Sequence, residues 1–129
     1  MSTKMIVSDL DGTLFNSDCE GYGVSKELIS YIKKFKEKGN MFTIATGRPI
    51  ETSIEVAKEV GINAPYITYN GAKIVDINGE KIYSERFLIK EILFFLREVE
   101  KFGASIILYV NGKILCFKYT QRISVYEKK

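Results

Sequence analysis

The segment Asp9-Leu10-Asp11-Gly12-Thr13-Leu14 places two carboxylates at positions i and i+2, directly after the apolar run Met5-Ile6-Val7. At the end of a β-strand, such side chains point the same way and lie about 6–7 Å apart. Paired carboxylates can hold Mg²⁺ together with carbonyl oxygens and a substrate phosphate. One carboxylate can also attack phosphorus, while its neighbour protonates the leaving oxygen and later activates water. The alternative interpretation is an acidic turn that only caps the following loop.

A second polar segment, Thr46-Gly47-Arg48, follows the apolar run Met41–Ala45 and precedes a helical pattern. A threonine hydroxyl, a glycine amide and a helix N-terminus together suit a phosphoryl group. The alternative is a structural one, in which Thr46 caps the helix and Gly47 makes room for the turn. Ligands of open α/β sheets bind outside the carboxyl ends of strands. Because both polar segments follow neighbouring predicted strands, the phosphate interpretation is favoured.

The elements that must position these residues alternate between strand and helix. Short apolar runs predict strands, and apolar residues at helical spacing, each pattern ended by a glycine at Gly39 or Gly61, predict two helices. This order is typical of right-handed crossovers in a parallel sheet flanked by helices. The predicted elements are a strand Lys4–Leu10, a helix from Ser25, a strand Met41–Ala45, a helix carrying Ile50, Ile54, Ala57 and Val60, and a strand Pro65–Tyr69.

The pattern changes after Asn70. Asn78-Gly79 and Asn111-Gly112 are strong signals for β-hairpins, and between them an amphipathic helix is predicted over Leu88–Phe102. The predicted hairpin strands are Ala72–Asp76 with Lys81–Ser84, and Ser105–Val110 with Lys113–Lys118. We therefore expect two parts, residues 1–87 with a parallel α/β core and residues 88–129 with a helix and a hairpin. Six aromatic side chains are expected to pack in the core or in the cap rather than to form a cofactor site: Tyr22, Tyr31, Phe35, Phe94, Phe95 and Phe102.

The composition excludes several classes of protein. The chain has 129 residues, 46% hydrophobic and 27% charged, as expected for one soluble globular domain with or without an appendage. The net charge of +3 is too small to indicate a nucleic-acid partner. No apolar run approaches the ~18 residues of a membrane helix, and neither a secretory signal nor a cysteine framework is recognisable, so we expect a cytoplasmic protein. The absence of histidine excludes Ser-His, Cys-His and histidine-ligated zinc chemistry.

These motifs carry a resemblance to a known family. Asp9-Leu10-Asp11-Gly12-Thr13-Leu14 resembles motif I of the haloacid dehalogenase (HAD) superfamily, and Thr43-Ile44-Ala45-Thr46-Gly47-Arg48 resembles its motif II. The segment Tyr66–Ala72 is similar to the one that leads to the cap in the Cof-type phosphatase branch. The helix and hairpin after Phe87 resemble the first unit of that branch's α/β cap.

The resemblance implies a partial Rossmannoid core and a Mg²⁺-dependent phosphatase that acts on small phosphorylated metabolites. It assigns Asp9 as nucleophile and Mg²⁺ ligand. It assigns Asp11 as the general acid/base, which binds Mg²⁺ through its backbone carbonyl. The remaining residues that it places at the substrate are Thr46 and the Gly47 amide, which would hold the phosphoryl group, and Arg48 and Asn70, which would border the pocket.

Two further motifs of the family, a charge-neutralising lysine and an acidic cluster, are not recognisable in this sequence. Phosphoryl transfer depends on charge neutralisation, so their loss is expected to lower turnover by several orders of magnitude. Without the strands that carry them, the strand Lys4–Leu10 is expected to be a bare apolar edge. We therefore expect a homodimer through that edge or through the hairpin Ser105–Lys118. The alternatives to an enzyme are a non-catalytic phosphate- or metal-binding module and a self-associating remnant of such a hydrolase.

Overall fold

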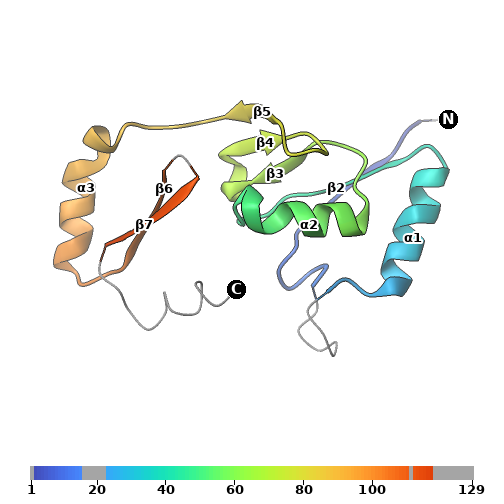
Figure 1. Ribbon diagram of the computed structural model, residues 1–129, viewed down its shortest axis with the longest axis horizontal. Helices are drawn as coiled ribbons and strands as arrows, with labels where there is room; N and C mark the ends of the chain where they lie inside the picture. Colours follow the sequence, from blue (N-terminus) through green and yellow to red (C-terminus); the bar gives the residue numbers. More distant parts are fainter. Residues whose placement is uncertain (1, 16–22, 111, 118–129) are drawn as a thin grey trace. The chain divides into compact units, whose positions relative to one another are not determined.

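The computed structural model describes residues 2–15, 23–110 and 112–117 (Figure 1). The chain divides into two compact units, Met1–Arg86 and Phe87–Lys129. Within the described ranges, none of the helices is both long enough and apolar enough to cross a membrane.

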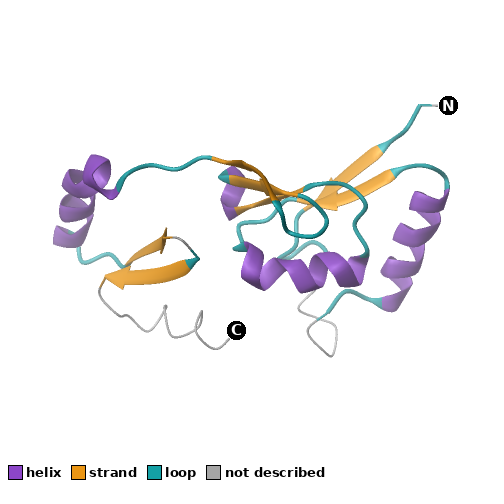
Figure 2. Ribbon diagram, turned by 45° about the horizontal axis from the view of Figure 1, so that its top comes forward, coloured by secondary structure: helices purple, strands orange, loops and turns teal. Residues whose placement is uncertain are grey.

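The first unit alternates strand and helix, as the sequence predicted (Figure 2). Strands β1 and β2 run parallel, with Met5 opposite Met41 and Ser8 opposite Ile44. A single parallel bridge between Ala45 and Ile67 connects the end of β2 to β3. The α/β class with a parallel sheet is therefore confirmed. Its elements are β1 (Met5–Ser8), α1 (Lys26–Glu37), β2 (Met41–Ile44), α2 (Ile50–Val60), β3 (Tyr66–Thr68), the short 3₁₀ helix η1 (Tyr69–Gly71), β4 (Lys73–Val75) and β5 (Lys81–Ser84).

Strand β3 has a second role that the sequence did not indicate. It pairs antiparallel with β4, so that Tyr66 lies opposite Val75, and β4 pairs antiparallel with β5. The predicted hairpin around Asn78-Gly79 is present, and the Asp76 carboxylate closes its turn by accepting the Asn78 and Glu80 amides at 2.9 and 2.8 Å. The first unit thus changes from parallel to antiparallel pairing at β3.

Capping residues mark the start of α1 and the end of α2. The Ser25 hydroxyl accepts the Leu28 amide at 3.2 Å at the start of α1. Gly61 ends α2 in the left-handed conformation, with a φ of 69°. Each helix turns an apolar face to the core, and burial of that face, rather than helix propensity, supplies most of its stability. The buried core consists of Leu10, Leu14, Val24, Ile32, Phe42, Ile44, Ala57, Val60, Ile62, Tyr66 and Val75.

The second unit consists of α3 (Ile89–Lys101) and a hairpin of β6 (Ile106–Val110) and β7 (Lys113–Phe117). The strands pair antiparallel with Val110 opposite Lys113, as the Asn111-Gly112 signal predicted.

The expected packing of the aromatic residues is wrong at several positions. The side chains of Phe94, Phe95 and Phe102 are 78%, 64% and 87% exposed, and Tyr31 on α1 is also exposed. In the second unit, a single helix and a two-stranded hairpin offer too little surface to cover every aromatic residue. Tyr22 lies outside the described residues.

Candidate functional site

The carboxyl ends of β1 and β2 lie at the same level. The Ser8 carbonyl accepts the Ala45 amide at 2.9 Å, so Asp9 and Thr46 are the residues that follow this paired position on the two strands. Asp9 is exposed. Its backbone carbonyl accepts the Ser8 hydroxyl at 3.0 Å, whereas within the described residues its carboxylate has no hydrogen-bond or ion-pair partner. The carboxylate of Asp9, the first of the two predicted carboxylates, is therefore exposed to solvent at the carboxyl end of β1.

The turn that follows, residues 10–15, is tight and anchored in the core. Leu10 is fully buried, and its carbonyl accepts the amides of Phe15 at 2.9 Å and Thr13 at 3.3 Å. Gly12 donates to the Phe15 carbonyl and has a φ of 80°, a conformation that glycine adopts without a steric penalty. With Leu10 fixed inside, this turn presents the Asp11 side chain outward.

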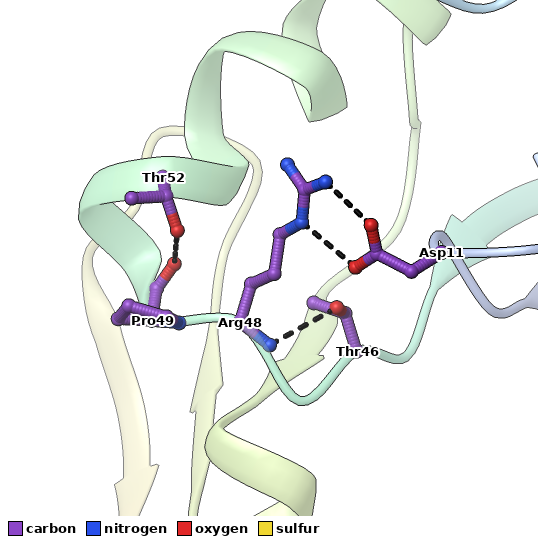
Figure 3. Close-up of polar contacts among 5 residues, drawn as sticks. All are labelled: Asp11, Thr46, Arg48, Pro49 and Thr52. Atoms are coloured by element: carbon purple, nitrogen blue, oxygen red, sulfur yellow. Dashed lines mark hydrogen bonds and ion pairs between the residues drawn. The ribbon is translucent and has the colours of Figure 1, made fainter. Parts of the chain in front are cut away.

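Asp11 forms a two-point ion pair with Arg48 (Figure 3). The Arg48 Nε donates to one carboxylate oxygen at 2.8 Å, and Nη2 donates to the other at 2.5 Å. The guanidinium also lies over the Phe15 ring, 5.0 Å from its centroid. The Asp11 side chain is 54% exposed and that of Arg48 is 22% exposed, so solvent screens the attraction. The pair therefore contributes more to geometry than to stability.

Thr46 is buried, and it folds the segment between β2 and α2. Its amide donates to the Ile67 carbonyl at 2.9 Å, and its hydroxyl accepts the Arg48 amide at 3.1 Å (Figure 3). The alternative interpretation, in which Thr46 caps the helix, is wrong, because the N-cap of α2 is Pro49 and no side chain caps it. The Thr46 hydroxyl instead stabilises the bend at Gly47.

Tyr69 and Asn70 hold the same segment from the side of β3. Both adopt the left-handed conformation, with φ values of 53° and 55°, which is uncommon for residues other than glycine. Their amides donate to the carbonyls of Arg48 at 3.1 Å and Thr46 at 3.2 Å. Two successive strained residues thus fix both ends of Thr46-Gly47-Arg48.

Residues 6–129 match the sequence profile of the haloacid dehalogenase-like hydrolases. The chain belongs to this family. The resemblance that the two motifs carry is thereby confirmed.

Phosphatases are among the relatives of this HAD-family chain. A Buchnera aphidicola protein that is provisionally named a phosphatase is 38% identical over 92 residues, which are 69% of this chain and 33% of that protein. The HMP-PP phosphatase of Klebsiella pneumoniae is 30% identical over 82 residues, 64% of this chain and 29% of the enzyme. A solved haloacid dehalogenase-like hydrolase of Bacillus subtilis is 26% identical with a TM-score of 0.78, covering 97% of this chain and 43% of that one. The chain spans about a third of the length of the curated relatives it matches.

The candidate residues of this HAD-family chain come together in one network. Hydrogen bonds connect Asp11 to Arg48, Arg48 to Thr46, and Thr46 to Asn70. Gly47 lies between these contacts, and Asp9 is placed beside them by the register of β1 and β2. Sequence reasoning missed Phe15 and Tyr69. An aromatic residue in a turn gives no signal of its own, and only the Asn70-Gly71 pair hinted at a turn next to Tyr69.

Oxygen atoms are the donors available for a metal ion in this HAD-family site. Across residues 2–15, 23–110 and 112–117, no group of three or more His, Cys, Asp or Glu side chains is arranged to hold a metal ion. The open Asp9 carboxylate and the Asp11 backbone carbonyl are hard donors of the kind that Mg²⁺ prefers, and Mg²⁺ usually keeps several waters or phosphate oxygens. The Asp11 carboxylate forms an ion pair with Arg48 and is therefore not counted among these donors. The residues therefore fit a Mg²⁺ ion that takes its other ligands from water and substrate.

Proposed function

We propose that this chain carries the nucleophile and the phosphate-binding segment of a Mg²⁺-dependent phosphatase that acts on small phosphorylated metabolites. The observation that carries the proposal is the Asp11–Arg48 ion pair, which joins the carboxylate turn of β1 to the hydroxyl and amide groups that follow β2. A nucleophile and a phosphate cradle must lie within reach of the same phosphorus atom. The names of the relatives, which include several phosphatases, support the substrate class.

The proposed role of each residue is the one that the family resemblance implies. The Asp9 carboxylate attacks phosphorus, and the bond from phosphorus to the leaving oxygen breaks. Asp11 in its protonated form gives its proton to that oxygen, and as a carboxylate it later takes a proton from the water that hydrolyses the aspartyl-phosphate. The Thr46 hydroxyl and the Gly47 amide hold the phosphoryl oxygens. Arg48 and Asn70 border the substrate.

The proposed Mg²⁺ ligands of this chain are the Asp9 carboxylate and the Asp11 backbone carbonyl. Bound there, Mg²⁺ would supply neutralisation of the charge on the phosphoryl group. The lysine and the acidic cluster that would complete this neutralisation in the family are not recognisable in the sequence. We therefore propose that the 129 residues alone turn over slowly.

The test is hydrolysis of p-nitrophenyl phosphate with Mg²⁺ by the chain and by its Asp9→Asn variant. The expected result is a weak activity that Asp9→Asn abolishes. Glu55→Gln is the matched control, because Glu55 is an exposed acid on α2 away from the β1 turn and should leave the rate unchanged. Equal rates for the chain and for Asp9→Asn would remove the catalytic proposal.

A second candidate function is a non-catalytic phosphate- or metal-binding module. It is favoured by the hydrogen bonds that fix both ends of Thr46-Gly47-Arg48, because an ordered segment of this kind can bind phosphate without turnover. Titration calorimetry with inorganic phosphate and with Mg²⁺ separates the two functions. Saturable binding without hydrolysis supports the module, whereas turnover that depends on Asp9 supports the enzyme.

We also propose a division of labour between residues 1–87 and residues 88–129. The first part carries all the proposed site residues. The helix and hairpin of the second part, α3 with β6 and β7, are proposed as part of a cap that selects the substrate. Removing the second part should then change substrate preference, measured over a panel of sugar and nucleotide phosphates, without abolishing inorganic phosphate binding.

Strand β1 supports a proposal of self-association. Its side chains Met5, Ile6 and Val7 are 49%, 44% and 49% exposed, and among the described strands it pairs only with β2. Exposed apolar edges of this kind recruit a further strand, and we propose a second copy of the chain in that place. Sedimentation velocity at tens of micromolar should show a dimer that Ile6→Lys dissociates. A strictly monomeric chain would contradict the proposal.

A further inference from the structure

Three side chains form a stack at the rim of the sheet: the Phe15 ring, the Arg48 guanidinium and the Asp11 carboxylate. The guanidinium lies 5.0 Å from the ring centroid and donates two hydrogen bonds to the carboxylate. We infer that Phe15 and Arg48 are positioning residues that fix the direction of the Asp11 carboxylate. The inference rests on the proposed function, in which the ionised Asp11 carboxylate takes a proton from the attacking water.

The geometry of the turn explains why the stack can act as a clamp. Phe15 and Asp11 belong to one tight turn, where they form a β-bridge and the Gly12 amide donates to the Phe15 carbonyl at 3.1 Å. The aromatic face and the carboxylate therefore reach the same guanidinium from a common backbone unit. The Arg48 guanidinium contacts the Phe15 ring with its face and the Asp11 carboxylate with its edge. Together these two contacts restrict the rotation of the guanidinium and of the carboxylate.

The other end of Arg48 is fixed as well. Its amide donates to the buried Thr46 hydroxyl at 3.1 Å, and its carbonyl accepts the Tyr69 amide at 3.1 Å. A side chain that is held at its backbone, at its guanidinium face and along its guanidinium edge is poorly placed to follow a substrate. Arg48 therefore acts on the substrate through Asp11, whereas the family resemblance implies only that it borders the substrate pocket.

Lysine cannot replace Arg48 in this arrangement. A guanidinium is planar and offers parallel donors to both carboxylate oxygens, whereas an ammonium is a point charge without a stacking face. In the same way, leucine at Phe15 keeps an apolar side chain but has no π face, and tyrosine keeps the face. These differences give matched variants for each half of the stack.

The experiment is NMR of the full chain, labelled with ¹⁵N and ¹³C, at fixed neutral pH. In the unchanged chain, the Arg48 Nε–H resonance is expected to be shifted upfield by the Phe15 ring. Phe15→Leu should remove that shift and move the Asp11 carboxyl ¹³C resonance, and Phe15→Tyr should restore both. Arg48→Lys should also move the Asp11 resonance. Phe94→Leu, at an exposed position of the second unit, is the control and should change neither.

The outcomes separate this inference from the proposed function. A folded Phe15→Leu or Arg48→Lys variant with an unchanged Asp11 resonance overturns the positioning role of that residue. If Phe15→Leu does not fold, Phe15→Tyr and Arg48→Lys decide. Where turnover is measurable, Phe15→Leu should lower kcat about two- to five-fold with KM unchanged, and a raised KM with unchanged kcat would overturn the inference. Absence of Asp9-dependent turnover refutes the proposed function. The NMR comparison then decides by itself whether Phe15 and Arg48 position the Asp11 carboxylate.

Discussion

The Asn70 side chain occupies the space that any side chain on Gly47 would need. A Cβ at Gly47 would lie 2.8 Å from Asn70 Oδ1, closer than real Cβ atoms approach a neighbour, and 3.2 Å from Nδ2. Glycine at this position is therefore favoured by the close approach of the Asn70 side chain, and not by a positive φ angle. The two residues come from different strand ends, so their contact joins the segment after β2 to the segment after β3.

This contact predicts that Gly47→Ala destabilises the chain. Both residues are exposed, so the methyl group displaces only the end of the Asn70 side chain, and the cost is expected to be about 1 kcal/mol, at the low end of the overpacking range. Chemical denaturation measures the loss in the free energy of unfolding. Gly23→Ala is the matched control, since a Cβ there meets nothing within 4 Å and the φ of Gly23 is not positive.

The double variant Gly47→Ala with Asn70→Gly tests the cause. Removing the Asn70 side chain makes room for the methyl group, so the double variant should recover most of the stability that Gly47→Ala loses. If the changes in the free energy of unfolding caused by the two substitutions are instead additive, the clash is not the cause of the destabilisation.

The left-handed conformation of Asn70 gives a second prediction. At a φ of 55°, asparagine and glycine are tolerated better than alanine. Asn70→Ala should therefore unfold more easily than Asn70→Gly by about 1 kcal/mol, although glycine is the more flexible residue in the unfolded chain. Urea denaturation of the two variants decides, and an Asn70→Ala variant as stable as Asn70→Gly would show that the left-handed turn carries no strain.

Local patterns in the sequence were sufficient for the order of the elements. The apolar spacing of α1 and α2, the glycine that ends each, and the two Asn-Gly hairpins depend on neighbouring residues, and the structure has them where the sequence predicted. The pairing of β3 with β4 was missed because Pro65–Tyr69 had been assigned only to the parallel sheet. In a strand of three residues, the sequence pattern does not distinguish a strand with one neighbouring strand from a strand with two.

The candidate site was predictable only in part. The sequence placed Asp9, Asp11 and Thr46 at neighbouring strand ends, because strand order and polarity follow from the strand–helix alternation. The ion pair of Asp11 with Arg48 depends instead on side-chain direction within the turn, and the stacking of Phe15 depends on a bend made by Gly12. Neither the side-chain direction in the turn nor the bend at Gly12 produces a periodic pattern of residue types in the sequence.

Thr46 gives a third prediction. Thr46→Val keeps the buried shape but removes the acceptor of the Arg48 amide, so the free energy of unfolding should fall by about 1 kcal/mol. Hydrogen exchange of the Arg48 amide should become faster. Thr46→Ser keeps the hydroxyl and should retain the slow exchange. Thr3→Val, at an exposed position before β1, is the control and should change stability by less than about 0.5 kcal/mol. Unchanged exchange in Thr46→Val would show that another group holds the Arg48 amide.

Tyr66 makes the stability of the chain sensitive to alkaline pH. Its side chain is fully buried, and within the described residues its hydroxyl has no hydrogen-bond partner. Burial raises the pKa of the Tyr66 phenol above the ordinary value of 10.0, and the nearby Ser53 hydroxyl opposes only part of that rise. The unfolded chain therefore releases the phenolic proton at a lower pH than the folded chain. The stability that depends on the neutral phenol is complete below about pH 10 and is lost as the pH rises through the folded pKa.

The Tyr66→Phe variant tests this dependence, because it removes the ionisable group and leaves the ring in the core. At neutral pH the substitution should be neutral or stabilising by up to about 1 kcal/mol, since a buried hydroxyl without a partner contributes little. Between neutral pH and about pH 11, denaturant unfolding of Tyr66→Phe should show a smaller loss of stability than the unchanged chain. Tyr31→Phe, at a position that is 59% exposed, is the control and should follow the unchanged chain. Equal alkaline losses in the unchanged chain and in Tyr66→Phe would mean that ionisation of Tyr66 is not coupled to unfolding.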